Sequence, residues 1–261
     1  MKKYKILSHL KIKSEIVPKY ILLPGDPSRV DVIGKQLSRF KIVNQNREFR
    51  TGIGFYKGIE ILVCSTGIGG PSTAIVIEEL IDAGATTLIR IGTCGGAWRK
   101  DILNGSIIIP EASIRDEGTT LEYVPLGFPA VANVDIISSL KKSVKNNKGK
   151  YFSGINRTHD AFYGNQNSII KWGQYLLDER WRKYDTPIIS SEMESSILFV
   201  IATLKGVRAG AILLANSNPE PLRERLNEKK QEVKTEINEK KTQNNIENLI
   251  KITLEAIKIL K

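Results

Sequence analysis

The sequence predicts an α/β fold built on a mixed, largely parallel β-sheet that is covered by helices on both faces. First, short apolar, β-branched runs alternate with stretches of helical periodicity from one end of the chain to the other. Second, 261 residues with 41% hydrophobic and 26% charged side chains are enough for a single domain with a large core. Strands that alternate with helices form sheets buried on both faces, and ligands bind at the carboxyl ends of their strands.

The order of the elements follows from these patterns. The strands are expected in β-branched runs that end at or near Gly, Pro or Asn, at residues 20–25, 59–67, 86–96, 106–114, 151–159 and 206–216. The helices are expected at residues 28–37, 71–84, 133–147, 191–205 and 246–260. In the second helix, Ser72 can cap the start and Gly84 the end. The last helix carries one apolar stripe, which should pack on the sheet.

One long segment does not fit this alternation. Residues 217–245 are polar and begin with Ser-Asn-Pro-Glu-Pro. The segment is too long for an ordinary connection between two elements. We therefore expect a mobile helical flap within an otherwise single domain, residues 1–261.

The net charge of +11 raises the question of a nucleic-acid partner. The lysines are mixed with glutamates, most densely at residues 222–241, which is typical of a solvated helix face. The sequence contains no helix-turn-helix spacing, zinc finger or aromatic RNA-binding strand. We expect no nucleic-acid partner.

Cysteine usage and hydropathy indicate the compartment. Cys64 and Cys94 are the only cysteines and do not form a Cys-x-x-Cys pair, so a disulfide framework or zinc site is not expected. The first twenty residues lack the apolar centre of a signal peptide, and no apolar run is long enough for a membrane span. A soluble, cytoplasmic protein without a membrane partner is the expectation.

The stretch SSEMESSILFVIATLKG (190–206) places two carboxylates before an apolar helix. Burying an unpaired carboxylate is unfavourable, so both need an explanation. Ser191-x-x-Glu194 has the spacing of a capping box, which would explain Glu194. It leaves Glu192 without a role.

Arg90 is a second unusual residue, because it lies in the middle of a strand built for burial, LIRIGTCGG (88–96). A buried arginine needs an anionic partner, which can be a glutamate or a bound anion. Two glycine-rich turns follow neighbouring strands, LPGDPSR (23–29) and STGIGGPS (65–72), and neither matches a Rossmann fingerprint or a P-loop. In the first turn, Gly25 allows close approach to a ligand, and Arg29 adds donors at a helix N-terminus.

Together these motifs resemble the nucleoside phosphorylase-I family. The matching stretches, in order, are GDPSR, NREF, STGIGGPSTAIVIEEL, IRIGTCGG, FPAVAN and EMES, and they run from about His9 to Asn216. The resemblance implies a three-layer α/β fold of phosphorylase type, whose mixed sheet closes towards a barrel flanked by helices. It also implies a homo-oligomer, with a dimer as the catalytic unit and usually a hexamer.

The resemblance assigns roles to individual residues. The phosphate site would consist of Gly25, Arg29, Arg90, Thr93 and, from a neighbouring subunit, Arg47. The ribose site would consist of Glu192, Met193, Glu194 and, from a neighbouring subunit, His9. Glu194 would accept hydrogen bonds from the 2′- and 3′-hydroxyls, and Arg90, Glu194 and Arg29 would be the catalytic residues. Inorganic phosphate would be the co-substrate with no cofactor required. Potassium could bind at Glu48, Ile68 and Ser72, as in some uridine phosphorylases.

The base-binding positions resemble the uridine branch more than the purine branch. The purine branch carries a Ser-Asp pair whose Asp protonates N7, whereas this chain has Ala215-Asn216 there. Phe162 could stack on the base, and Gln166 could hydrogen-bond uracil.

Two departures keep the choice of base open. Ser168 and Ser217 stand where uridine phosphorylases carry arginines, and Asn216 could instead hydrogen-bond N7 of guanosine or inosine. His159 is either a second donor to the base or an ordinary loop histidine.

The expected reaction is phosphorolysis of a nucleoside, with uridine foremost. In its transition state the sugar resembles an oxocarbenium ion, and carboxylates would stabilise the positive charge that develops on it. The arginines would align the phosphate for attack. The alternatives are a purine-nucleoside or 5′-methylthioadenosine phosphorylase, a nucleosidase that uses water, and a non-catalytic nucleic-acid binder. The presence of Arg29, Arg47 and Arg90 argues against a nucleosidase.

Overall fold

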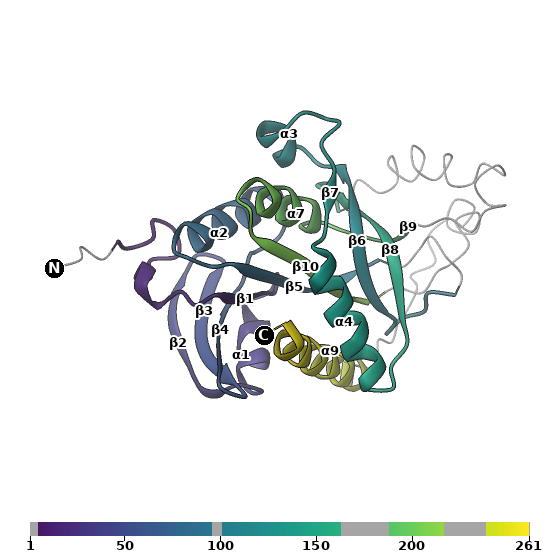
Figure 1. Ribbon diagram of the computed structural model, residues 1–261, viewed down its shortest axis with the longest axis horizontal. Coiled ribbons are helices and arrows are strands. Elements are labelled where there is room, and N and C mark those ends of the chain that lie inside the picture. Colours follow the sequence, from purple (N-terminus) through teal and green to yellow (C-terminus); the bar gives the residue numbers. More distant parts are fainter. Residues whose placement is uncertain (1–4, 96–100, 163–187, 217–238, 261) are drawn as a thin grey trace.

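A mixed β-sheet with helices on both faces forms the framework of the computed structural model (Figure 1). The structure describes residues 5–95, 101–162, 188–216 and 239–260, with side chains from residue 244 onward in the last stretch. The strands are β1 (Tyr20–Leu23), β2 (Ser38–Asn46), β3 (Phe49–Tyr56), β4 (Ile59–Cys64), β5 (Thr87–Cys94), β6 (Ile107–Asp116), β7 (Ala130–Val131), β8 (Tyr151–His159), β9 (Ile188–Glu192) and β10 (Arg208–Ala215). The helices are α1 (Pro27–Gly34), α2 (Gly70–Asp82), α3 (Thr119–Tyr123), α4 (Val134–Asn146), α7 (Ser195–Leu204) and α9 (Glu239–Leu260), with a 3-10 turn at Ser14–Ile16.

The strand order is β2-β3-β4-β1-β5-β10-β6-β8-β9, with β7 paired to β6. The neighbours β4, β1, β5 and β10 are parallel, as are β6, β8 and β9, and the two blocks meet in the antiparallel pair β10–β6. Two backbone hydrogen bonds between Gly95 and Ser191, of 2.9 and 3.0 Å, bring the end of β9 back to the end of β5. This return places residues at the carboxyl ends of β5 and β9 side by side.

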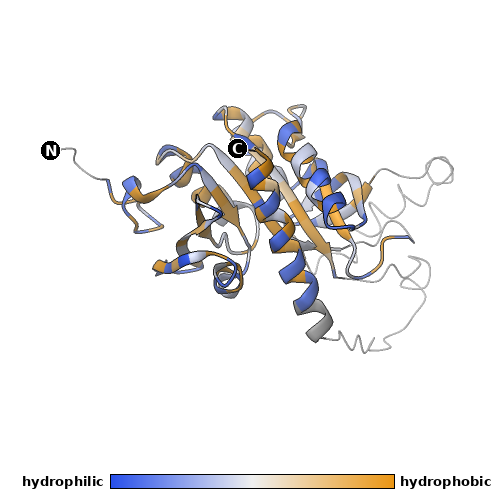
Figure 2. Cartoon of the chain, turned by 60° about the horizontal axis from the view of Figure 1, so that its bottom comes forward, coloured by the Kyte–Doolittle hydropathy of each residue, from blue (hydrophilic) through white to orange (hydrophobic). Residues whose placement is uncertain are grey.

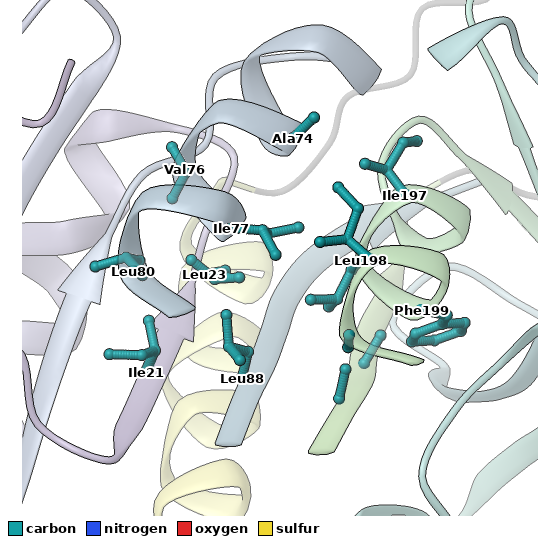
Figure 3. Close-up of a cluster of buried hydrophobic side chains, with 14 of the residues drawn as sticks. Ile21, Leu23, Ala74, Val76, Ile77, Leu80, Leu88, Ile197, Leu198 and Phe199 are labelled. Carbon is teal, nitrogen blue, oxygen red and sulfur yellow. The ribbon is translucent and has the colours of Figure 1, made fainter. Parts of the chain in front are cut away.

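Two apolar cores lie on opposite faces of the sheet. On one face, α2 and α7 pack on alternate strand residues that include Ile21, Leu23 and Leu88, as Figure 3 shows. On the other face, α1, α4 and α9 pack on the intervening strand residues, such as Leu22 and Ile89. This alternation is the period of two of a strand buried on both sides. Figure 2 shows orange, apolar strands in the centre and alternating blue and orange residues on α9.

The predicted fold class and the predicted elements are largely confirmed. The strands correspond to β1, β4, β5, β6, β8 and β10, and the helices to α1, α2, α4, α7 and α9. Gly84 ends α2 as predicted, with a φ of +111° and a hydrogen bond from Ala85 N to Leu80 O. Ser72 does not cap the start of α2, because its hydroxyl donates to the carbonyls of Ile68 and Gly69. Of the predicted flap, residues 239–245 belong to α9, and the rest lies outside the described residues.

The hairpin β2–β3 is missing from the sequence-based prediction. Most residues of β2 are exposed or half-buried, so its apolar pattern is weak. The two strands pair in an antiparallel register. The ring of Phe40 occupies the space beside Gly34 and Gly52, and a Cβ on either glycine would lie within 2.3 Å of the ring. Among the described residues, no helix is long and apolar enough to cross a membrane.

Candidate active site

Arg90 lies at the centre of the candidate site, on β5 beside the returning end of β9. Its side chain is 6% exposed. The Nε donates to Oε2 of Glu192 at 2.9 Å, and Nη2 forms an ion pair with Oε2 of Glu194. Burial disfavours the charged guanidinium, but Glu194 and Glu192 outweigh it and raise the pKa of Arg90. Both glutamates therefore serve as anionic partners of Arg90.

The third nitrogen of Arg90 has no such partner. Its Nη1 is buried and makes no hydrogen bond with any described residue. It lies 3.9 Å from the position that a Cβ on Gly25 would occupy, in the turn between β1 and α1. A buried N–H without an acceptor is unfavourable, and a site that binds an anion is one explanation for it.

Glu192 is the most fully hydrogen-bonded group of the site. Its carboxylate accepts from the side chains of Arg90, Asn156 and Thr158, and from the backbone N–H groups of Glu194 and Ser195. Burial opposes its ionisation, but Arg90 and the N–H and O–H donors prevail and lower the pKa of Glu192. The predicted capping box is therefore wrong: the structure has a strand up to Glu192, α7 begins at Ser195, and Glu192 rather than Ser191 satisfies its first N–H groups.

Glu194 lies in front of α7 and faces the glycine-rich turn before α2. Its Oε1 accepts from the N–H of Gly69 at 2.7 Å, and its Oε2 pairs with Arg90. Burial raises the pKa of Glu194; Arg90 opposes this rise, and the charge of Glu192 adds to it. Glu194 is thus a carboxylate with two fixed contacts, and its neighbour Met193 is only half-buried.

The start of α1 brings a second guanidinium towards Arg90. Asp26 caps this helix by accepting from the N–H of Ser28 at 2.8 Å, and Pro27 is its first residue. Arg29 is half-buried in the first turn. Burial lowers the pKa of Arg29, the charge of Asp26 opposes this, and the charge of Arg90 lowers it further. Two guanidinium groups thus interact next to a helix N-terminus, where an anion is favoured.

The other two side chains predicted for the phosphate site, Thr93 and Arg47, differ in exposure. Thr93 is half-buried on β5, three residues after Arg90. Arg47 is exposed at the turn between β2 and β3, with a φ of +55°. Whether the Arg47 of a second subunit reaches Arg90 stays a prediction.

His9 is anchored to α2 by Glu79. The ring Nδ1 of His9 lies 2.7 Å from Oε1 of Glu79, whose carboxylate also accepts from the backbone N–H groups of His9 and Leu10. His9 and Met193 line one open cavity of about 1030 Å³ together with Gly69, Thr119 and Asp160. The His9 side chain is 49% exposed and accessible from this cavity.

The residues predicted for potassium lie close together. A Cβ on Gly67 would lie 2.7 Å from Cγ of Glu48 and 3.2 Å from Oγ of Ser72, and this Oγ donates to the carbonyl of Ile68. No group of three or more His, Cys, Asp or Glu side chains that could hold a metal occurs in the described part of the chain. Burial raises the pKa of Cys64 to about 12, so this thiol is a weak ligand and nucleophile.

The base-side residues are described only in part. Phe162 is 61% exposed after β8, Asn216 is exposed after β10, and Gln166 lies outside the described residues, as do Ser168 and Ser217. His159 is the last residue of β8 and is buried rather than part of a surface loop. Burial and then Arg157 lower its pKa, which favours the neutral ring.

Sequence reasoning missed several residues of the site. Asn156 and Thr158 contact Glu192, Gly69 contacts Glu194, and a Cβ on Gly92 would lie 2.8 Å from Nη2 of Arg90. For Gly92 a signal was available, since a glycine two residues after a buried arginine in a strand lies on the same face. For Asn156 and Thr158 no local signal exists, because β8 and β9 meet only in the folded sheet.

Comparisons with known proteins show the family of the chain. A family model described as the phosphorylase superfamily matches residues 19–258. The chain is 36% identical to the uridine phosphorylase of Treponema pallidum over 253 residues, covering 97% of this chain and 93% of that protein. It is 33% identical to the guanosine phosphorylase of Halorubrum lacusprofundi over 252 residues, covering 97% and 98%. The crystal structure of uridine phosphorylase from Vibrio fischeri superposes with a TM-score of 0.81 at 30% identity, covering 98% of both chains.

Proposed function

This chain belongs to the phosphorylase superfamily, and we propose that it cleaves nucleosides, uridine foremost, with inorganic phosphate to give the free base and ribose 1-phosphate. The observation that carries the proposal is the buried Nη1 of Arg90, which faces the Gly25 turn without a partner among the described residues. A pentosyltransferase needs an anion-binding group at this place, next to the carboxylates that would hold the sugar. The proposed phosphorylase domain is the whole chain, residues 1–261.

Phosphate would bind at the Gly25 turn. Nη1 of Arg90 and the guanidinium of Arg29 would donate to its oxygens, with Thr93 as a further donor. A phosphate oxygen forms the new bond to C1′ of the sugar while the bond from C1′ to the base nitrogen breaks, and its electron pair leaves with the base. Alignment of the nucleophile by charged groups lowers the barrier of such a displacement.

The sugar would be held by Glu194 and Met193. The carboxylate of Glu194 is fixed by Gly69 and Arg90, so it is oriented before the sugar arrives. It would accept hydrogen bonds from the 2′- and 3′-hydroxyls, and its negative charge would favour the positive charge that develops on the sugar ring. One well-placed charged contact of this kind contributes about 2–4 kcal/mol of barrier lowering.

The base would lie near the ends of β8 and β10. Phe162 would stack on it, and Gln166 would hydrogen-bond uracil. The exposed ring of Phe162 supports a partly apolar surface for a base.

A second subunit would complete the site. We propose a dimer in which His9 and Arg47 reach into the neighbouring site, further assembled into a hexamer. Ile68 is 78% exposed and Leu126 is 77% exposed, and a second subunit would cover such large apolar side chains. Potassium is proposed at the interface near Glu48, which lies beside Ser72.

A second candidate substrate is guanosine or inosine. Ala215-Asn216 ends β10, and the amide of Asn216 would hydrogen-bond N7 of a 6-oxopurine. A guanosine phosphorylase is among the relatives that match nearly the whole chain. In either case the proposed role is nucleoside breakdown or salvage in the cytoplasm.

Release of free base from uridine, inosine, guanosine, adenosine and 5′-methylthioadenosine, with and without phosphate, tests the proposal. We expect cleavage of uridine that requires phosphate. Cleavage without phosphate would identify a nucleosidase, and faster cleavage of guanosine or inosine would reverse the assignment of the base. Salt-sensitive RNA or DNA binding with no cleavage of any nucleoside would refute the proposed enzymatic function.

A further inference from the structure

We propose that Glu192 is a positioning residue for Arg90, held by a buried network of neutral polar side chains, rather than a ligand of the sugar. The inference deepens the proposed function and rests on it. The network residues come from three strands, and the structure buries all of them: Ser113 of β6, Asn156 and Thr158 of β8, and Ser190 of β9. The resemblance to the family gives Glu192 a different role, at the ribose.

The first argument is that the acceptor capacity of Glu192 is used up. Oε1 accepts from Nδ2 of Asn156 at 2.7 Å, from Oγ1 of Thr158 at 2.8 Å and from Ser195 N at 3.1 Å. Oε2 accepts from Nε of Arg90 at 2.9 Å and from the N–H groups of Glu194 and Ser195, both at 3.0 Å. A carboxylate offers about four lone-pair sites, so no site is left for a sugar hydroxyl. The side chain is also 2% exposed.

The second argument is that the network fixes the direction of each donor. The carboxylate of Glu192 can only accept, so Nδ2 of Asn156 faces it at 2.7 Å, and Oδ1 of Asn156 then accepts from the hydroxyl of Ser190 at 2.9 Å. The same Nδ2 lies 2.9 Å from Oγ of Ser113, which contacts Oγ1 of Thr158 at 2.7 Å. Neutral donors that already point at one spot favour an ionised carboxylate there.

The third argument concerns what an ionised Glu192 does to Arg90. A guanidinium is planar, so its orientation is set when two of its nitrogens are held. Glu192 holds Nε and Glu194 holds Nη2, which leaves Nη1 directed at the Gly25 turn. When a sugar approaches Glu194, Glu192 is the partner that keeps the guanidinium in place.

The test measures the KM for phosphate and the KM for uridine separately in each variant. Glu192→Gln keeps the size of the side chain but replaces the carboxylate, which only accepts hydrogen bonds, by an amide whose NH2 group would face other donors. We expect the KM for phosphate to rise about 10- to 100-fold, because a charge-assisted hydrogen bond to Arg90 is lost, while the KM for uridine changes less than about two-fold. Glu194→Gln should raise the KM for uridine and also that for phosphate, since Glu194 holds Nη2 of Arg90, so a rise for phosphate alone is what distinguishes Glu192. Glu60→Gln, which removes an exposed carboxylate on β4, is the matched control and should change neither constant.

A second variant keeps the inference testable if Glu192→Gln does not fold. Asn156→Asp places a carboxyl group 2.7 Å from Glu192, and two carboxylates so close share one proton. The KM for phosphate of this variant should be higher than that of wild type while this proton is bound, because the proton weakens the hold of Glu192 on Arg90, and it should fall as the pH rises through the pKa of the shared proton. Asn146→Asp, on the exposed surface of α4, is the control. The other titratable groups that act on Glu192 or are acted on by it are Arg90, Cys94, His159 and Glu194.

Binding of phosphate alone distinguishes the two possible failures. Calorimetry with inorganic phosphate should show binding to the wild-type protein and about 10- to 100-fold weaker binding to Glu192→Gln. A wild-type protein that neither binds phosphate nor cleaves a nucleoside would refute the proposed function itself. A wild-type phosphorylase whose Glu192→Gln variant raises the KM for uridine, alone or as much as that for phosphate, would overturn only the positioning role.

Discussion

Gly92 offers the sharpest test of the site, because its missing side chain makes room for Arg90. The two residues lie two positions apart on β5 and face the same side of the sheet. A Cβ on Gly92 would lie 2.8 Å from Nη2 and 2.9 Å from Cζ of Arg90, and 2.9 Å from Cδ2 of Leu213. Ordinary van der Waals contact begins at 3.4 Å, so in Gly92→Ala the guanidinium must move by about 0.6 Å.

The size of the effect follows from this shift. The guanidinium is held by Glu192 and Glu194, and a shift of this size lengthens at least one of these contacts. Misplacement of a catalytic group by 1 Å costs roughly 100-fold, so we expect a loss of about 10- to 100-fold in kcat/KM for phosphate. Overpacking of a buried site costs about 1–3 kcal/mol, and the free energy of unfolding should fall by this amount.

The assay is uridine phosphorolysis at varied phosphate, combined with urea unfolding of the same preparations. Gly127→Ala is the matched control, since a Cβ on Gly127 meets no atom within 4 Å and the variant should behave as wild type. A Gly92→Ala protein with wild-type kcat/KM for phosphate would show that the position of Arg90 does not matter for phosphate use. The reasoning about the site would then be wrong.

Three further results are expected. Arg90→Met leaves two buried glutamates without their cation, which should lower the free energy of unfolding by about 3–5 kcal/mol at pH 8. The loss should be smaller at pH 5, because the two glutamates can then take up protons. Equal losses at both pH values in urea titrations would contradict this. Burial disfavours an ionised Glu79, but the N–H of Leu10 and the ring and N–H of His9 outweigh it and lower the pKa of Glu79. The stability from this anchor is therefore present above the ordinary glutamate pKa and is lost as the pH falls through the folded value. The protection of the amides of residues 9–10, measured as their exchange rate relative to that of an unfolded chain at the same pH, should therefore fall in acid and in Glu79→Gln but not in neutral wild type. Burial and then Arg157 lower the pKa of His159, so its ring signals in NMR should titrate below the ordinary histidine pKa, and a midpoint at or above that ordinary value would contradict the lowering by burial and Arg157.

The sequence alone singled out Arg90, which lies at the centre of the candidate site, because it breaks a local rule. An arginine inside an apolar strand requires an anion, and two alternatives were open, a glutamate or a bound anion. The structure pairs Arg90 with two glutamates and still leaves Nη1 without a partner among the described residues. The two alternatives are therefore compatible, since a guanidinium has three nitrogens and the carboxylates use two of them.

The parts that sequence reasoning could not predict depend on contacts between distant segments. The start of α7 was placed at Ser191 because Ser191-x-x-Glu194 has capping-box spacing, whereas pairing of β8 with β9 keeps the chain extended as far as Glu192. Tertiary pairing thus overrides a local helix signal. The role of Asn156 is hidden for the same reason, since it lies 36 positions before Glu192 and meets it only across that strand pair.

The charges of the assembled site indicate why phosphate and sugar can assist each other. Arg29 and Arg90 together carry two positive charges, and Glu192 and Glu194 together carry two negative charges when both are ionised. In the proposed reaction, phosphate at Nη1 would add negative charge to this nearly neutral group, in a place that the structure buries. A positive charge that develops on a sugar between phosphate and Glu194 would then be favoured in the transition state more than in the neutral nucleoside. Such a difference between the two states accelerates a reaction. Because Glu192 is bound to Arg90 and to the network behind it, it contributes charge balance without competing for the sugar.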